Sequence, residues 1–224
     1  MGSICDARFS PGPGGASPHC LRQAAVTGRG TDSTGERSGL GGFRGRLHDG
    51  ELARVLVLGD SISRGDDAPT PSRGFVSLWA DGLHERFGAR ILVTNLSLGG
   101  ATIKDARRML RMAKTLSNYD LLVLAVGVND AANRVPFGTF RRALGGIAKT
   151  CERAGVEMLI VTPLNPTNGD VAPYVRLMRS SGLPTADVNA GWNDRPLANG
   201  INHPDAAGHR YYADVLLAAV GADA

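Results

Sequence analysis

Short apolar runs alternate with longer amphipathic stretches from residue 54 onward, and this alternation limits the possible folds more than any other feature. The runs resemble strands buried on both faces, the fifth less clearly than the others, and lie at residues 54–58, 91–95, 121–125, 158–161 and 185–188. Stretches typical of helices lie at residues 75–87, 103–112, 137–154, 171–179 and 205–220. This order predicts an α/β fold, a three-layer α/β/α sandwich with a five-stranded parallel sheet.

The first 50 residues differ in composition from the rest of the chain. They are rich in Gly, Ser, Pro and Arg and have no sustained period of 2 or 3.6 residues. Such a segment buries too little apolar surface to offset the entropy lost when it orders. We therefore expect a disordered tail over residues 1–50 and one folded domain over residues 51–224.

Composition argues against several classes of protein. The longest apolar run, residues 121–126, falls far short of the about 18 residues that a membrane-spanning helix needs, and the N-terminus does not resemble a secretory signal. We therefore expect a cytoplasmic protein with no membrane partner. The three cysteines fit neither a disulfide framework nor a zinc site. The net charge is +4, but the basic residues are not interleaved with aromatic residues as is typical of nucleic-acid-binding surfaces. The oligomeric state stays open.

Four polar segments lie where strands are expected to end or where the last helix is expected to begin. They are Gly59-Asp60-Ser61-Ile62-Ser63, Asn95-Leu96-Ser97-Leu98-Gly99-Gly100, Gly127-Val128-Asn129-Asp130 and Asn202-His203-Pro204-Asp205. In an open parallel sheet, ligands bind beyond the carboxyl ends of the strands. We therefore expect the four segments to meet at one edge of the sheet.

The residue types in these segments suggest acyl transfer. A serine at a strand-to-helix turn, Ser61, would expose its hydroxyl, and His203 is the natural base to activate it. Gly100 could offer a backbone N–H, and Asn129 a side-chain amide, to stabilise an oxyanion. Asp60 is better explained as a turn residue that binds backbone amides than as a catalytic acid.

In this order, the four segments resemble the sequence blocks of the SGNH hydrolase superfamily, the GDSL-type esterases and lipases. The resemblance runs from Val55 to about Tyr212. It implies a flavodoxin-like SGNH hydrolase fold, with Ser61 as nucleophile and His203 as general base. It also implies an oxyanion hole formed by the N–H groups of Ser61 and Gly100 and by the Asn129 side chain. No metal or organic cofactor is implied.

The last segment departs from the family pattern at the acid that orients the histidine. The family usually has an aspartate three residues before the histidine, or four in longer variants, and here these positions hold Gly200 and Asn199. An asparagine oxygen can still accept the imidazole N–H, so we expect a Ser–His dyad oriented by Asn199 or by a backbone carbonyl. Recruitment of Asp194 or Asp187 and a catalytically impaired protein are the alternatives.

The sequence therefore predicts a serine esterase that hydrolyses a small-molecule carboxylic ester through an acyl-serine intermediate. We expect a short acyl group, such as acetyl on a carbohydrate or small alcohol, because the polar connections at residues 65–73 and 165–170 offer no apolar insertion for a long chain. Thioester cleavage and acyl transfer would use the same residues. The missing aspartate also leaves a non-catalytic binding module as an alternative.

Overall fold

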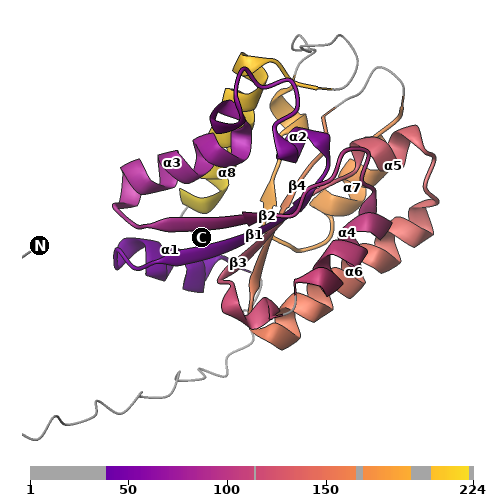
Figure 1. The fold of residues 1–224 in the computed structure, drawn as a ribbon. Coiled ribbons are helices and arrows are strands. Elements are labelled where there is room, and N and C mark those ends of the chain that lie inside the picture. The colour runs from indigo at the N-terminus through magenta and orange to yellow at the C-terminus, as the bar shows by residue number, and fades with distance from the viewer. Residues whose placement is uncertain (1–38, 114, 165–168, 193–202, 222–224) are drawn as a thin grey trace, which may run out of the picture. The chain divides into compact units, whose positions relative to one another are not determined.

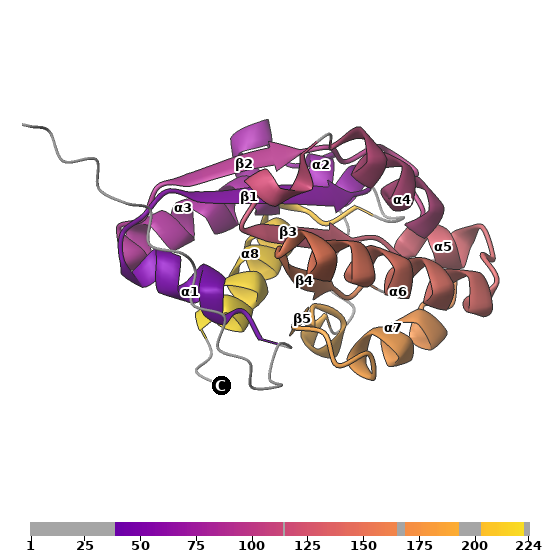
Figure 2. The ribbon, with the colours of Figure 1, turned by 90° about the horizontal axis from the view of Figure 1, so that it is seen from below.

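Five strands form one parallel sheet in the order β2-β1-β3-β4-β5 (Figure 1 and Figure 2). This computed structural model describes residues 39–113, 115–164, 169–192 and 203–221, all within one of the chain's two units, Glu36–Ala224. The strands are β1 (Ala53–Gly59), β2 (Ile91–Asn95), β3 (Leu121–Ala125), β4 (Glu157–Val161) and β5 (Thr185–Ala186). All neighbouring pairs run parallel, which confirms the predicted sheet.

Strand β2 lies at an edge of the sheet and is not the fully buried strand that its apolar sequence predicts. Its residues are partly or largely exposed, and Leu92 keeps 54% of its surface accessible. Strand β3, in contrast, lies inside the sheet and is buried along its whole length. An apolar run therefore indicates a strand here without indicating how fully its neighbours cover it.

Helices cover the two faces of the sheet, as predicted, and the described residues hold six longer ones, one more than the five expected from the sequence (Figure 2). They are α1 (Gly41–His48), α3 (Phe75–Phe87), α4 (Ile103–Met112), α6 (Phe137–Ala154), α7 (Ala172–Arg179) and α8 (Ala206–Gly221). Shorter helical segments are α2 (Ser61–Arg64), α5 (Val128–Ala132) and three 3-10 turns at Pro71–Arg73, Leu116–Asn118 and Asn189–Gly191. In the described part of the chain, no helix has the length and apolarity needed to cross a membrane.

Each face of the sheet has its own apolar core. Helices α1, α3 and α8 pack on Val55 and Val57 of β1, whereas α4, α6 and α7 pack on Leu56 and Leu58. Successive side chains of a strand point to opposite faces, so one continuous apolar run supplies both cores. This arrangement explains why β1 reads as uninterrupted apolar sequence rather than as an alternating pattern.

The folded domain begins earlier than residue 51, so the predicted boundary of the N-terminal tail is wrong. Helix α1 lies inside the segment expected to be disordered, and Leu40, Phe43 and Leu47 are almost completely buried against the first core. Burial of these three side chains, on the order of 1.5–3 kcal/mol each, offsets the poor helix propensity of the surrounding glycines. Residues 1–38 of the predicted tail lie outside the described part of the chain.

The strand order places a topological switch point between β1 and β3. The chain passes from β1 to β2 on one side and then returns to β3 on the other side of β1. Connections that leave the carboxyl ends of β1 and β3 therefore diverge and leave a crevice, which is where open α/β sheets bind their ligands. The segments that carry Ser61 and Asn129 follow these two strands directly.

Candidate active site

Ser61 is the first residue of α2, immediately beyond the carboxyl end of β1. The preceding Asp60 is almost completely buried, and its Oδ1 atom accepts the N–H of Ile62 at 3.0 Å, which caps the helix. Asp60 therefore has the turn-forming role expected from the sequence. The cap fixes the direction in which α2 leaves the sheet and exposes the partly accessible Ser61 at its start.

His203 meets Ser61 across a separation of 142 positions in the sequence. The Nε2 atom of His203 lies 2.8 Å from the Oγ atom of Ser61, within hydrogen-bonding distance. His203 lies just before α8, and the buried Pro204 follows it. The structure thus brings together the serine and the histidine that the sequence singled out.

The other ring nitrogen of His203 has a carboxylate partner that sequence reasoning missed. Its Nδ1 atom lies 2.8 Å from the Oδ2 atom of Asp67, which belongs to the connection after α2. The His203 side chain is 20% exposed and that of Asp67 is 40% exposed, so the pair lies at the rim of the site. Asp67 has a left-handed backbone with φ +61°, a conformation that aspartate adopts more readily than most residues.

The acids weighed from the sequence are placed differently. Asp187 binds Arg179 with its Oδ2 atom 2.7 Å from Nε, and its Oδ1 atom accepts the Thr162 hydroxyl at 2.9 Å, so it serves the β4–β5 region rather than His203. Asn199 and Asp194 lie outside the described residues. These acids and Asn199 all lie within 16 residues of His203 in the sequence, whereas the adjacent aspartates 66 and 67 follow α2 at the same edge of the sheet.

Asn129 lies at the start of α5 and reaches toward the segment that holds Ser61. Its Nδ2 atom donates to the carbonyl oxygen of Ala101 at 3.2 Å and lies 3.5 Å from Oδ2 of Asp60. Gly100 has φ +75°, and its N–H donates to no other described residue. A left-handed residue without a side chain can present its N–H to the crevice without steric cost.

Side-chain hydrogen bonds tie the four segments into one unit. Asn95 donates from Nδ2 to the carbonyl oxygen of Ser63 at 2.8 Å, which links the second segment to α2. Both carboxylate oxygens of Asp130 lie 3.1 Å from the N–H of Ile103 at the start of α4. Because Asp130 is fully buried, this contact holds the glycine-containing turn against the third segment. This role of Asp130 is not predicted by the sequence analysis.

These four segments correspond to a known family. A model of the GDSL-like Lipase/Acylhydrolase family matches residues 57–211, more than half of the chain. The chain belongs to this family. It is therefore an ester-hydrolysing enzyme with the predicted SGNH hydrolase fold, and membership favours an enzyme over a non-catalytic binding module.

Solved structures share the fold of this GDSL family member at low sequence identity. LAE5, described as an alpha/beta hydrolase enzyme from the metagenome of Lake Arreo, Spain, is 22% identical with a TM-score of 0.63 and covers 75% of this chain and 95% of its own. TesA is 22% identical with a TM-score of 0.65, and the match covers 75% of this chain and 98% of TesA. Axe2, an acetylxylan esterase from Geobacillus stearothermophilus, is 18% identical, with a TM-score of 0.63 and coverage of 76% and 95%. Comparison with curated protein sequences finds no significant match.

Burial raises the pKa of two aspartates in these segments, Asp60 and Asp130, and so favours their neutral forms. It raises the pKa of Asp60 to about 7, although the N–H groups of Ile62 and Ser63 favour its charged form. Burial also raises the pKa of Asp130 to about 6, against the opposing effect of the Ile103 N–H. Both carboxyl groups are removed from water by the fold, and among the described residues no cationic side chain forms a hydrogen bond with either.

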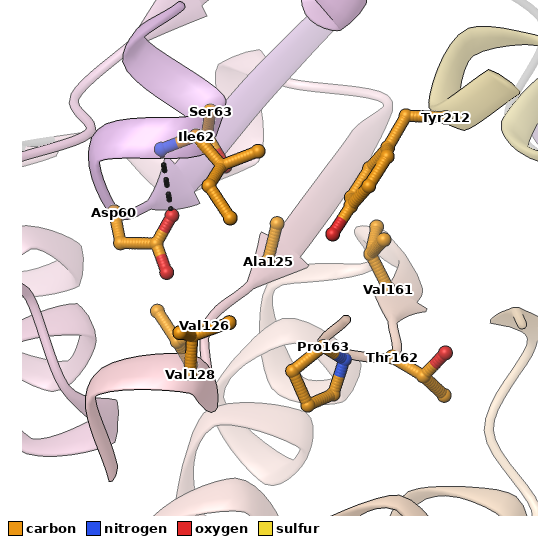
Figure 3. A pocket seen from close by; sticks show the side chains of 10 residues that line it. All are labelled: Asp60, Ile62, Ser63, Ala125, Val126, Val128, Val161, Thr162, Pro163 and Tyr212. Atoms are coloured by element: carbon orange, nitrogen blue, oxygen red, sulfur yellow. Dashed lines mark hydrogen bonds between the residues drawn. The ribbon is translucent and has the colours of Figure 1, made fainter. Parts of the chain in front are cut away.

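A small pocket lies behind α2 and beside Asp60 (Figure 3). Tyr212 reaches toward it from α8, and Ala125 and Val161 line it from β3 and β4. Its volume is about 10 Å³, roughly the space of one water molecule. Ser61 does not line this pocket, whereas its neighbours Asp60 and Ile62 do.

Proposed function

We propose that the chain hydrolyses carboxylic esters through an acyl intermediate on Ser61, with His203 as general base and general acid. The observation that carries this proposal is the 2.8 Å contact between Ser61 Oγ and His203 Nε2. An isolated serine hydroxyl is a weak nucleophile, and a hydrogen-bonded base is the usual way in which enzymes activate it.

In the first step, Ser61 Oγ attacks the carbonyl carbon of the ester while its proton moves to Nε2 of His203. The carbonyl oxygen becomes an oxyanion. Collapse of this intermediate breaks the bond to the alcohol oxygen, and the imidazolium returns the proton to the departing alcohol. Water then attacks the acyl-Ser61 ester with His203 again as base, which releases the acid and restores the serine.

The N–H groups of Ser61 and Gly100 and the side-chain amide of Asn129 form the oxyanion hole in this proposal. The Nδ2 atom of Asn129 lies 3.2 Å from the carbonyl oxygen of Ala101 and 3.5 Å from Oδ2 of Asp60. The second of these contacts is at the limit of a hydrogen bond, so one amide hydrogen can turn to an oxyanion at little cost. The neighbouring segments keep the donor in place before substrate arrives, which is the condition for strong stabilisation.

We propose a short acyl group, such as acetyl on a carbohydrate or another small alcohol. The small size of the pocket beside Asp60 and Ser63 supports this choice, because a long acyl chain needs a larger apolar channel near the nucleophile. The descriptions of two structural neighbours also support an acetyl group. One is the acetylxylan esterase Axe2, and the other is a two-domain esterase active on acetylated mannans, which is 20% identical with a TM-score of 0.65.

The test is a series of nitrophenyl esters from acetate to octanoate, assayed with the full chain and with Ser61→Ala. We expect kcat/KM to be highest for acetate, to fall with chain length, and to vanish in Ser61→Ala for every ester. Preference for octanoate would refute the short acyl group but leave the serine mechanism standing. Activity that survives in correctly folded Ser61→Ala would refute the mechanism itself.

A further inference from the structure

We propose that Asp67 is the positioning carboxylate of this site, in place of the aspartate that the family carries shortly before the histidine. The inference rests on the proposed function of Ser61 and His203. It assigns the missing acid to the connection after α2, on the same segment as the nucleophile, instead of to the segment of the base.

The two ring nitrogens of His203 require different partners. To receive the serine proton, Nε2 must carry a lone pair, so the hydrogen of the neutral ring must be on Nδ1. An ionised carboxylate only accepts hydrogen bonds, and Asp67 Oδ2 lies 2.8 Å from Nδ1. Asp67 thereby selects the tautomer in which Nε2 faces Ser61 Oγ as an acceptor, and its negative charge stabilises the imidazolium formed during attack.

The backbone around Asp67 is held from within the nucleophile segment. The N–H of Asp66 donates to the carbonyl oxygen of Ser61 at 3.0 Å, and the N–H of Ala68 donates to that of Gly65 at 3.2 Å. The left-handed conformation of Asp67 between these bonds turns its side chain back toward His203. The carboxylate and the nucleophile thus share one short stretch of chain, which fixes their separation.

A second histidine, His209, contacts the connection that follows α2. His209 of α8 is fully buried, and its Nδ1 atom lies 3.3 Å from the N–H of Phe75, so Nδ1 is an acceptor. The hydrogen of the neutral ring is then on Nε2, which lies 3.4 Å from the carbonyl oxygen of Asp66. Burial lowers the pKa of His209, so the ring keeps this neutral, one-donor form at neutral pH.

The adjacent carboxylate of Asp66 is engaged elsewhere and provides a matched control. Its Oδ1 atom accepts from Arg64 Nε at 2.7 Å, and its other oxygen pairs with the same guanidinium. Asp66 and Asp67 therefore carry the same charge at neighbouring positions, but only Asp67 contacts the imidazole in the described structure. Replacing each aspartate with asparagine removes the same charge, but only the replacement of Asp67 changes the group that contacts the imidazole. The comparison therefore separates the effect of the direct contact from the effect of the lost charge.

The kinetic test compares Asp67→Asn with Asp66→Asn, each in the native background and in His203→Ala, with nitrophenyl acetate as substrate. We expect Asp67→Asn to lower kcat/KM roughly 10- to 100-fold, less than the about 10⁴-fold cost in a protease triad, because this pair is partly exposed. Asp66→Asn should change kcat/KM by about threefold or less. In the His203→Ala background, Asp67→Asn should add no further loss. Equal losses in the two single variants, or a full loss that persists without His203, would overturn the proposal.

The spectroscopic test uses the imidazole N–H proton of His203 in the whole chain, identified by its disappearance in His203→Ala. We expect the proton on Nδ1 to be protected from exchange in the native chain and in Asp66→Ala, and lost in Asp67→Ala, which leaves no side-chain acceptor beside Nδ1. Its persistence in Asp67→Ala would overturn the proposal. This readout does not require turnover, so it stays decisive if Ser61→Ala shows that the proposed reaction is wrong.

Discussion

Asp60 Oδ2 and Asn129 Nδ2 lie 3.5 Å apart, so the residue that caps the nucleophile helix also faces the amide donor of the proposed oxyanion hole. This contact couples the end of β1 to the end of β3 at the point where the crevice of the sheet opens.

Asn129→Ala should lower kcat about 100- to 1000-fold with little change in KM, because the amide acts mainly on charge that develops in the transition state. Steady-state kinetics with nitrophenyl acetate would measure it. Asn133→Ala provides a control, since Asn133 is an exposed asparagine just after α5. A loss confined to KM would show that Asn129 binds the ground state instead.

Asp60 should make the protein less stable as pH rises from about 4 to about 7. The folded state holds the Asp60 proton up to a pKa of about 7, whereas the ordinary value is 3.8, so folding is favoured most at low pH and this contribution is lost as pH rises through 7. Denaturant titrations at pH 5 and pH 8 would measure the free energy of unfolding. The free energy of unfolding of Asp60→Asn, relative to that of the native chain, should increase from pH 5 to pH 8, and a difference that does not change with pH would contradict the assignment.

Gly59→Ala should destabilise the fold by about 1–3 kcal/mol, because the site has no room for a methyl group. A Cβ atom there would lie 3.0 Å from the carbonyl oxygen of Ala125 and would collide with the Ser63 side chain. Gly145→Ala is the matched control, since nothing lies within 4 Å of a Cβ on that exposed helical residue. It should stabilise the chain by roughly 0.4–1 kcal/mol. Denaturant midpoints that move in the same direction for both variants would contradict this interpretation.

His209 should make the protein less stable in acid. Burial lowers its pKa below the ordinary value of 6.5, so the unfolded chain takes up the proton first and stability is lost as pH falls below about 6.5. His209→Gln removes this proton uptake, so its free energy of unfolding relative to that of the native chain should increase as pH falls from 7 to 5. A difference that does not change with pH would argue that His209 is not held neutral.

Most of the fold could be predicted from the sequence because the apolar runs and amphipathic stretches match the elements closely. Helices α3, α4 and α6 begin and end at the predicted residues. Helix α1 was missed because its glycine-rich sequence has no local helical signal, and its stability comes from burial of Phe43 and its neighbours in a core formed by distant segments. Local patterns do not reveal such tertiary support.

The site could be predicted only in part, for a related reason. Ser61 and His203 stand in recognisable segments, and the structure brings them into contact. Asp67 stands in no such segment, and nothing in the sequence separates it from Asp66. The distinction depends on the left-handed backbone of Asp67 and on the Arg64 partner of Asp66, both of which are features of the folded chain.

The most direct test of the account is covalent labelling of the full chain by a fluorophosphonate, followed by mass spectrometry of the peptides. We expect one equivalent of label, located on Ser61, with much slower labelling in His203→Ala and none in Ser61→Ala. Label on another residue, or no label on correctly folded native chain, would contradict the central claim that His203 activates Ser61 as a nucleophile.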